Sequence, residues 1–205
     1  MCGRYLVDDE VYADMWMMLA ENAATNSPAL QAPQPAPVKG EVFPTNIAPV
    51  ITLDGAAAVK WGFPRWKGAG VIINARAETA MEKNLFRKPL LERRCVIPSS
   101  GFYEWDHTGG KKTKDKYLFR QPGERALYMA GMISLFRDDA GIEYGAFVIL
   151  TTAANESVAP IHDRMPVILA PDEKDRWIRD DGFLMHALQR AGPALELTAP
   201  AGKSP

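Results

Sequence analysis

The run CVIPSSGFYEW at residues 95–105 is rich in β-branched and aromatic side chains, the composition of a buried β-strand. Turn-forming segments with Gly, Asp and Lys follow, at 108–111 and 138–141. They separate further apolar runs of the same kind, at residues 117–120, 127–135, 144–152 and 166–169. The second half of the chain is therefore predicted to be mostly β-sheet.

The first half begins with a short strand at residues 1–7. The acidic run at 8–10 is suited to cap a helix through about residue 20, with Trp16 and Leu19 facing inward. Met15 and Met18 share that stripe and are expected in the core. Residues 22–40 have a repeated Pro-Ala character, which predicts a surface loop with polyproline-like stretches.

Residues 47–53, 56–63 and 71–73 are predicted strands, with a break at 64–68. The spacing of Met81, Leu85 and Leu90 predicts a helix over 78–91. Two further helices are expected at 172–179 and 183–190, and a flexible tail at 191–205. Because strands outnumber helices and rarely alternate with them, we expect one α+β domain over 1–205, with an antiparallel, barrel-like sheet core and peripheral helices.

The composition predicts a globular protein. The chain has 205 residues, of which 47% are hydrophobic, and a net charge of -1. No apolar run approaches the ~18 residues of a membrane span and no export signal is evident, so we expect a cytoplasmic protein. Two cysteines, Cys2 and Cys95, are too few for a disulfide framework. The three histidines are scattered, so no metal is expected.

Charge is unevenly distributed along the chain. Residues 60–94 hold nine Lys and Arg against three acids, whereas residues 1–59 hold two bases against seven acids. This local excess of positive charge is enough to contact a few phosphates of a nucleic acid. A solvated helix face explains Lys83, Arg87 and Lys88 equally well. Within this segment Trp66 lies between Arg65 and Lys67, and an aromatic in a basic loop can stack on an unpaired base.

Cys2 follows the initiator methionine. If Met1 is removed, Cys2 carries an α-amine and a thiol on adjacent carbons, and both are nucleophiles near neutral pH. With an aldehyde the amine can form an imine, and the thiol can close on it to give a five-membered thiazolidine. The alternative is a small hydrophobic residue at the start of a strand.

Asn74 and Arg76 follow the predicted strand 71–73. The Asn74 amide can hold a small polar ligand, and Arg76 can reach a phosphate. Alternatively, Asn74 caps the helix and Arg76 pairs with Glu78.

Glu104 is placed by strand alternation on one face with Phe102, while Tyr103 and Trp105 lie on the other. A carboxyl group among aromatic residues is poorly solvated and suited to proton transfer near neutral pH. The alternative is a solvent-facing strand residue.

His162 titrates in the working pH range and can move a proton, although a lone histidine is more often structural. If the segment around it is extended, Asp163 points away from His162 and pairs with Arg164.

Together these segments resemble the SOS-response-associated peptidase (SRAP) family of abasic-site processing proteins. The matching stretches occur in family order over roughly residues 1–170: MCGRY at 1–5, NIAP at 46–49, WG at 61–62 with Pro64 and Trp66, INARAET at 73–79, RCVIP at 94–98 with GFYEW at 101–105, and IHDRMP at 161–166.

The resemblance implies a single domain that binds single-stranded DNA and links Cys2 to the ring-opened aldehyde of an abasic deoxyribose. It places Asn74, Glu104 and His162 in the active site, and Arg4, Arg76 and Trp66 among or beside the DNA contacts. It also implies that the protein releases Met1 itself, and a lyase activity belongs to the same chemistry. We expect no cofactor and a monomer.

Two departures from the family pattern stand out. The family usually has Arg-Tyr before Asn-x-Ala-Pro, where this chain has Phe43-Pro44-Thr45, and the Val-Asn-Asn stretch of the family's C-terminal part is missing. A rival reading is an N-terminal-nucleophile hydrolase that uses Cys2 with His162 and Asn74. A third interpretation is a non-catalytic DNA-binding module, but it gives Glu104 and His162 no function.

Overall fold

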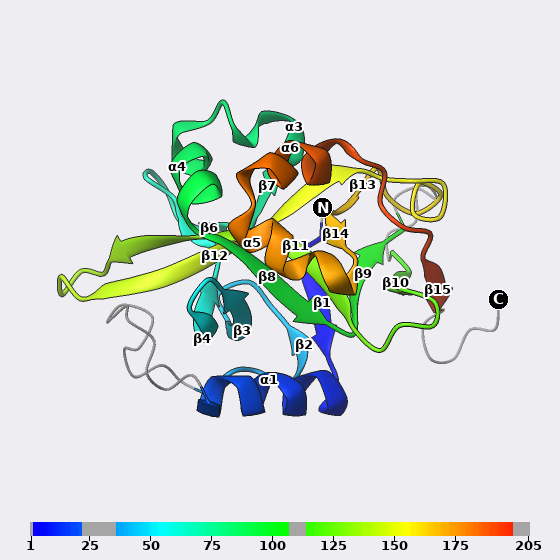
Figure 1. Ribbon diagram of the computed structural model, residues 1–205, viewed down its shortest axis with the longest axis horizontal. Coiled ribbons are helices and arrows are strands. Elements are labelled where there is room, and N and C mark those ends of the chain that lie inside the picture. Colours follow the sequence, from blue (N-terminus) through cyan, green and yellow to red (C-terminus); the bar gives the residue numbers. More distant parts are fainter. Residues whose placement is uncertain (1, 22–35, 107–113, 199–205) are drawn as a thin grey trace.

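A closed β-barrel forms the centre of the molecule (Figure 1). The computed structural model describes residues 2–21, 36–106 and 114–198. In the barrel each strand pairs with the next, and the β11–β12 pairing closes the ring. Every neighbouring pair is antiparallel except β4 and β12, which run parallel. The members are β3 (Ile47–Thr52), β4 (Gly55–Trp61), β8 (Arg94–Ser99), β11 (Leu127–Arg137) and β12 (Glu143–Ala153). The expected α+β fold with an antiparallel, barrel-like core is confirmed, apart from the parallel pair β4–β12.

A second sheet of five strands packs beside the barrel. The predicted strand at 95–105 is in fact two strands, because the chain passes from the barrel into this second sheet between Ser99 and Gly101. A side chain at Gly101 would place its Cβ 2.4 Å from the Phe119 carbonyl oxygen, so only glycine fits there. The order is β15 (Glu196–Thr198), β10 (Lys116–Arg120), β9 (Gly101–Trp105), β1 (Arg4–Val7) and β2 (Gly40–Val42).

Short strands extend the barrel. β7 (Asn74–Arg76) runs parallel to β12, and β13 (Arg164–Pro166) runs antiparallel to it. β14 (Ile168–Leu169) pairs with β11, so the predicted strand at 166–169 is also divided in two. β5 (Phe63–Pro64) and β6 (Val71–Ile72) form a separate hairpin. The strands expected at 47–53 and 71–73 are present with small changes in their bounds, whereas the strand expected at 56–63 ends at Trp61 and Phe63 belongs to β5.

Two hydrophobic clusters hold these layers together. One lies between the barrel, the second sheet and α1, and it includes the buried rings of Tyr5, Trp61 and Phe147. The other lies between the barrel and the remaining helices, where the Trp177 Nε1–H donates to the Cys95 carbonyl oxygen at 2.9 Å. The helices on this side are α3 (Ala77–Ala80), α4 (Asn84–Glu92), η1 (Pro171–Glu173), α5 (Lys174–Arg179) and α6 (Asp181–Gln189).

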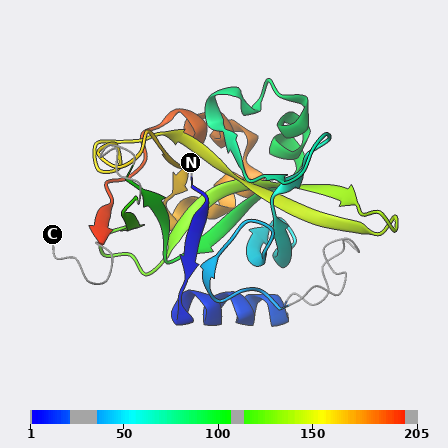
Figure 2. The same ribbon diagram turned by 180° about the vertical axis from the view of Figure 1, so that it is seen from behind.

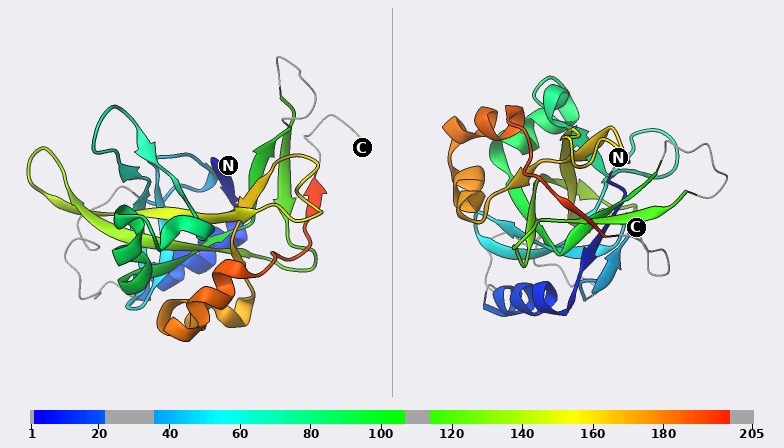
Figure 3. Two further views of the ribbon diagram at one scale, coloured as in Figure 1. Left: turned by 90° about the horizontal axis from the view of Figure 1, so that it is seen from above. Right: turned by 90° about the vertical axis from the view of Figure 1, so that its right-hand side faces the viewer.

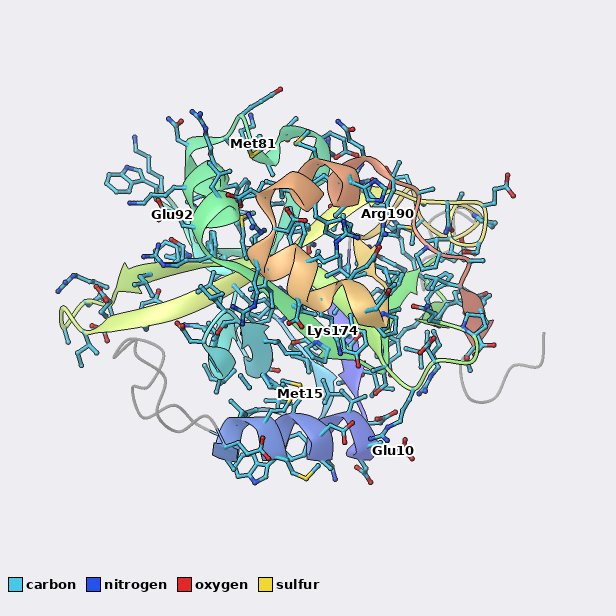
Figure 4. All side chains as sticks on the ribbon, in the orientation of Figure 1. Glu10, Met15, Met81, Glu92, Lys174 and Arg190 are labelled. Atoms are coloured by element: carbon cyan, nitrogen blue, oxygen red, sulfur yellow. The ribbon has the colours of Figure 1, made fainter. Side chains whose placement is uncertain are left out.

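The first helix, α1 (Asp9–Glu21), lies against the lower edge of the sheets (Figure 1). The Asp8 carboxylate accepts the Val11 backbone N–H at 3.1 Å, which is the expected cap. Met15 lies on the side that faces the sheets and is buried (Figure 4). The expectation that Trp16 faces inward is wrong, because its side chain is 49% exposed and stacks on Tyr12.

The helix predicted over 78–91 is two helices, α3 and α4. Lys83 interrupts the helix, because its backbone is extended (φ -86°, ψ 120°). This break changes the phase of the apolar stripe, so Leu90 is buried as expected but Leu85 is 39% exposed. The helices expected at 172–179 and 183–190 are confirmed as α5 and α6.

Part of the segment predicted as a flexible tail, 191–205, forms a strand. Residues 196–198 form β15 on the edge of the second sheet, where Leu197 pairs with Phe119. Residues 199–205, most of the loop predicted at 22–40 and the turn predicted at 108–111 lie outside the described residues. None of the described helices is long and apolar enough to cross a membrane.

Candidate active site

Four segments that are far apart in the sequence carry the predicted catalytic side chains: Cys2, Asn74, Glu104 and His162, together called the inner site. Cys2 precedes β1, Asn74 opens β7, Glu104 lies in β9, and His162 precedes β13. Asn74 Nδ2 donates to the Cys2 carbonyl oxygen at 2.8 Å. The His162 Nε2 atom lies 3.9 Å from Glu104 Oε2. Seen from behind, the blue strand β1 lies toward the viewer (Figure 2).

The Cys2 thiol is fully buried. Its Sγ atom lies 3.8 Å from the Arg4 carbonyl oxygen, a weak hydrogen bond. Burial raises the pKa of the Cys2 thiol far above its usual range, and the charge of Glu104 raises it further. The thiol is therefore protonated at neutral pH, and a nearby base must take its proton before it can act as a strong nucleophile.

Glu104 points inward, as strand alternation predicts. It is 1% exposed and Phe102 is fully buried on the same face, whereas Tyr103 and Trp105 are half-buried on the opposite face. Burial raises the pKa of Glu104 to about 7. A carboxyl group with this pKa is present in both protonation states at neutral pH, so it can donate and accept a proton.

The His162 ring is held through its Nδ1 atom. The Arg164 backbone N–H lies 3.0 Å from Nδ1, and Asp163 Oδ1 lies 2.9 Å from the same atom. A neutral ring accepts the Arg164 N–H and carries its proton on Nε2, facing Glu104, whereas a protonated ring donates to Asp163. The expected pairing of Asp163 with Arg164 is therefore wrong.

Arg164 pairs instead with Glu78 of α3. Two nitrogens of its guanidinium group donate to the two Glu78 carboxylate oxygens at 2.7 and 2.8 Å. These hydrogen bonds lower the pKa of Glu78. The alternative of Asn74 as a helix cap is wrong, because its side chain binds the Cys2 backbone and α3 begins after Arg76. The hydrogen-bond partner of Glu78 is Arg164, and Arg76 acts on Glu78 only through its charge.

Sequence reasoning missed the residues that support the His162 loop. Asn155 Oδ1 accepts the backbone N–H and the hydroxyl of Ser157, and its Nδ2 donates to the carbonyl oxygens of Gly192 and Pro193. Ser157 Oγ in turn accepts the Leu195 N–H at 3.1 Å. The Asn-Glu-Ser order at 155–157 is a turn signal that favours such a structure, but nothing in it indicates the link to residues 192–195.

The predicted DNA-binding residues Arg65, Trp66 and Lys67, together called the outer loop, lie between β5 and β6. All three are exposed, and Trp66 is 96% exposed. In the view from above, this hairpin and β9–β10 rise on the same side of the barrel, with the amino-terminal end between them (Figure 3). Arg76 is also exposed. The outer loop and the start of β1 therefore lie on the same side of the barrel.

Not every basic residue in the segment 60–94 is exposed to solvent. Arg94 is 5% exposed and donates to the carbonyl oxygens of Trp177 and Ile178 and to the Asp181 carboxylate, so it fastens α5 and α6 to the barrel. Arg4 is partly enclosed as well, since its Nη1 atom donates to Glu41 at 2.8 Å.

In the part of the chain that the structure describes, no group of three or more His, Cys, Asp or Glu side chains is placed to hold a metal ion.

Comparison with known proteins identifies similar sequences and folds. The model of the family "SOS response associated peptidase (SRAP)" matches residues 1–198. The abasic site processing protein YoaM of Bacillus subtilis is 38% identical over 155 residues, 68% of each chain. The abasic site processing protein YedK of Escherichia coli is 31% identical over 192 residues, 88% of this chain and 81% of that protein. A crystal structure of a protein from Bacteroides thetaiotaomicron superposes with a TM-score of 0.76 and 25% identity, covering 98% of this chain and 93% of that one.

Proposed function

The chain belongs to the SRAP family, and from this premise we propose that it captures abasic sites in single-stranded DNA during the response to DNA damage. The proposed product is a thiazolidine between Cys2 and the ring-opened deoxyribose. The observation that carries the proposal is the inner site: a cysteine next to the chain start, an amide bound to its backbone, and a carboxyl group that titrates at about neutral pH. The names of the relatives, abasic site processing proteins, agree with it.

The proposed chemistry needs no cofactor. Once the protein has released Met1, the Cys2 amine attacks C1′ of the sugar aldehyde, and the resulting carbinolamine loses one water molecule to form an imine. The Cys2 sulfur then adds to the same carbon while the thiol proton goes to the nitrogen. The sum is one C–N bond, one C–S bond and one water released, and the ring closure is favoured because it is intramolecular.

Glu104 is the proposed acid and base in these steps. Its protonated form donates to the hydroxyl group that leaves as water, and its ionised form accepts a proton from the thiol. A pKa of about 7 suits both tasks, and burial is the physical cause of that value. His162, with its Nε2 atom 3.9 Å from Glu104, is proposed to exchange protons with Glu104 and to bind the sugar hydroxyl.

Asn74 is proposed to position the nucleophile. Because its side chain binds the Cys2 carbonyl oxygen, it restricts rotation of the residue that carries both reacting groups. Fixing the amine near the aldehyde removes part of the entropic cost of the reaction. A strand break by β-elimination at the imine stage is the lyase reaction that the same site permits, and closure by the thiol competes with it.

Single-stranded DNA is the proposed partner, bound by a monomer. The outer loop presents two cations and an exposed indole on the same side of the barrel as the start of β1, and Arg76 adds a third cation. Cations follow the phosphates of an unpaired strand, while an aromatic ring stacks on its bases.

The rival function, a cysteine hydrolase, begins at the thiol, and its cysteine is commonly activated through a lowered pKa. Such sites lower the pKa of the cysteine with a neighbouring cation. Here burial and Glu104 raise the pKa of Cys2, which favours a reaction that begins at the amine and uses the thiol afterwards.

The test mixes the protein with single-stranded oligonucleotides that are either intact or abasic and separates the products on a denaturing gel. The proposal predicts a slowly migrating band with abasic DNA alone, and none with Cys2→Ala. A band with intact DNA, or no band with either, would contradict it.

A further inference from the structure

A compact group of charged and aromatic side chains covers the outer face of the second sheet. Antiparallel register places Arg4 opposite Tyr103 and Lys116 opposite Trp105, and directly paired residues share a face. Residues two apart in a strand share it as well. The group, called the outer cluster, consists of Arg4, Glu41, Phe43, Tyr103, Trp105 and Lys116.

Glu41 is the acid of this group and binds both of its cations. Its Oε1 atom accepts from Arg4 Nη1 at 2.8 Å and from Lys116 Nζ at 2.5 Å. Burial works to raise the pKa of Glu41, but the hydrogen bonds from Lys116 and Arg4 outweigh it and hold the pKa below its usual range. At neutral pH two cations therefore converge on one anion, and the trio keeps a net charge of one positive unit.

Aromatic rings flank both cations. The Arg4 guanidinium carbon lies 3.8 Å from the centre of the Phe43 ring and 5.3 Å from the Trp105 ring. Lys116 Nζ lies 3.9 Å from the centre of the Tyr103 ring. Phe43 is 42% exposed, and the other members are partly exposed. Cations beside open aromatic rings are the elements that bind unpaired nucleotides.

The outer cluster and the inner site share strands β1 and β9 but lie on opposite faces of the sheet. Tyr103 and Trp105 are the immediate neighbours of Glu104 in β9, and Arg4 is two residues from Cys2. Side chains alternate along a strand, so β9 presents its carboxyl group inward and its two rings outward. A DNA strand whose abasic sugar reaches Cys2 would therefore have to pass the edge of this sheet, at the start of β1, to bring a neighbouring nucleotide to the outer face.

We propose that the outer cluster is a subsite for the unpaired nucleotide next to the abasic site, and that Glu41 occupies the place of its phosphate until DNA binds. This inference rests on the proposed function. The phosphate enters between Arg4 and Lys116 and displaces the Glu41 carboxylate, and the base stacks on Tyr103 or Trp105. Because the carboxylate competes with the phosphate for the same two cations, Glu41 lowers the affinity for DNA.

The test compares Glu41→Gln with Lys116→Gln in binding intact single-stranded DNA, measured by fluorescence anisotropy over a range of salt concentrations. Both substitutions remove the charge pairing between Glu41 and Lys116, so a purely structural role would change affinity in the same direction. The proposal predicts opposite directions. Glu41→Gln should bind three- to tenfold more tightly, with a log–log salt slope steeper by about 0.7, and Lys116→Gln should bind correspondingly less tightly, with a shallower slope.

Glu124→Gln is the matched control. It removes the same charge from an exposed position in the turn between β10 and β11, so its affinity should stay within twofold of the wild type. Thermal unfolding of each variant shows whether it is folded, and Lys116→Arg, which keeps the charge, should retain most of the affinity.

A second experiment uses the 5′-to-3′ direction of the DNA strand. One oligonucleotide carries a tetrahydrofuran abasic analogue at its 5′ end and the other carries it at its 3′ end, so each extends to only one side of the inner site. Glu41→Gln should therefore raise the affinity for one of the two oligonucleotides and not for the other. An equal effect with both, or no gain in affinity while the wild type binds DNA, overturns the inference. A wild-type protein that binds neither intact nor abasic strands instead overturns the proposed function.

Discussion

Cys2 and Glu104 are almost completely buried, whereas Trp66, in the outer loop, is 96% exposed. The inner site brings together four segments that are distant in the sequence, and burial decides the protonation state of its groups. The outer loop is three consecutive residues in a hairpin, so only charge and stacking can contribute there. Substitutions in the inner site should therefore change the covalent step, and those in the outer loop should change affinity.

The largest expected effect is on the rate of covalent capture. Glu104→Gln keeps the shape of the side chain but cannot transfer a proton, so capture of abasic DNA should slow by ~10²- to 10⁴-fold. Binding to intact single strands should not change. Rates come from quenched time points on a denaturing gel, and a variant with wild-type rates would reduce Glu104 to a structural residue.

A second effect of Glu104 concerns stability. An ordinary glutamate in the unfolded chain titrates near ~4.3, whereas burial raises the pKa of Glu104 to about 7 in the folded protein. The folded state therefore holds this proton more tightly, and its contribution to stability is present below ~4 and is lost as the pH rises through about 7.

Glu104→Gln removes this dependence on pH. At pH 8 the variant should be more stable than the wild type by on the order of 2 kcal/mol, and the difference should shrink toward pH 4. Chemical denaturation at several pH values measures it. If the free energies of unfolding of the two proteins change with pH in the same way, burial does not perturb the pKa of this carboxyl group.

The outer loop should show the smaller effects. Trp66→Ala should weaken binding to intact single strands by about tenfold through lost stacking, with little change in salt dependence. Charge reversal at Arg76 should also weaken binding, but it should make the salt slope shallower. Anisotropy titrations distinguish the two, and unchanged binding in both variants would mean that the strand follows another path.

Sequence patterns predicted those features that depend on neighbouring residues. Alternation along one strand was enough to place Phe102 and Glu104 on the buried face. Features that depend on distant partners were not predictable in this way. Nothing local indicates that Asn74 binds the Cys2 carbonyl oxygen or that Arg164 takes Glu78.

Breaks in regular structure were also missed. The run at 95–105 has uniform β-strand composition, yet the close approach of Gly101 to the Phe119 carbonyl oxygen accompanies a change of sheet. In the same way, the apolar spacing from Met81 to Leu90 suits one helix, and the extended backbone of Lys83 divides it. Tertiary contacts outweigh local propensity at both points.

The central claim is that Cys2 reacts through its amine and its thiol together. It is tested most directly by placing a residue that cannot be removed before Cys2, which leaves the thiol intact but converts the amine to an amide without a basic lone pair. The account predicts that this protein binds single-stranded DNA as the wild type does and forms no stable crosslink to abasic DNA on a denaturing gel. Cys2→Ser, which keeps the amine, should give at most a weaker and reversible adduct. A stable crosslink by the blocked protein would contradict the account and make Cys2 an ordinary thiol nucleophile.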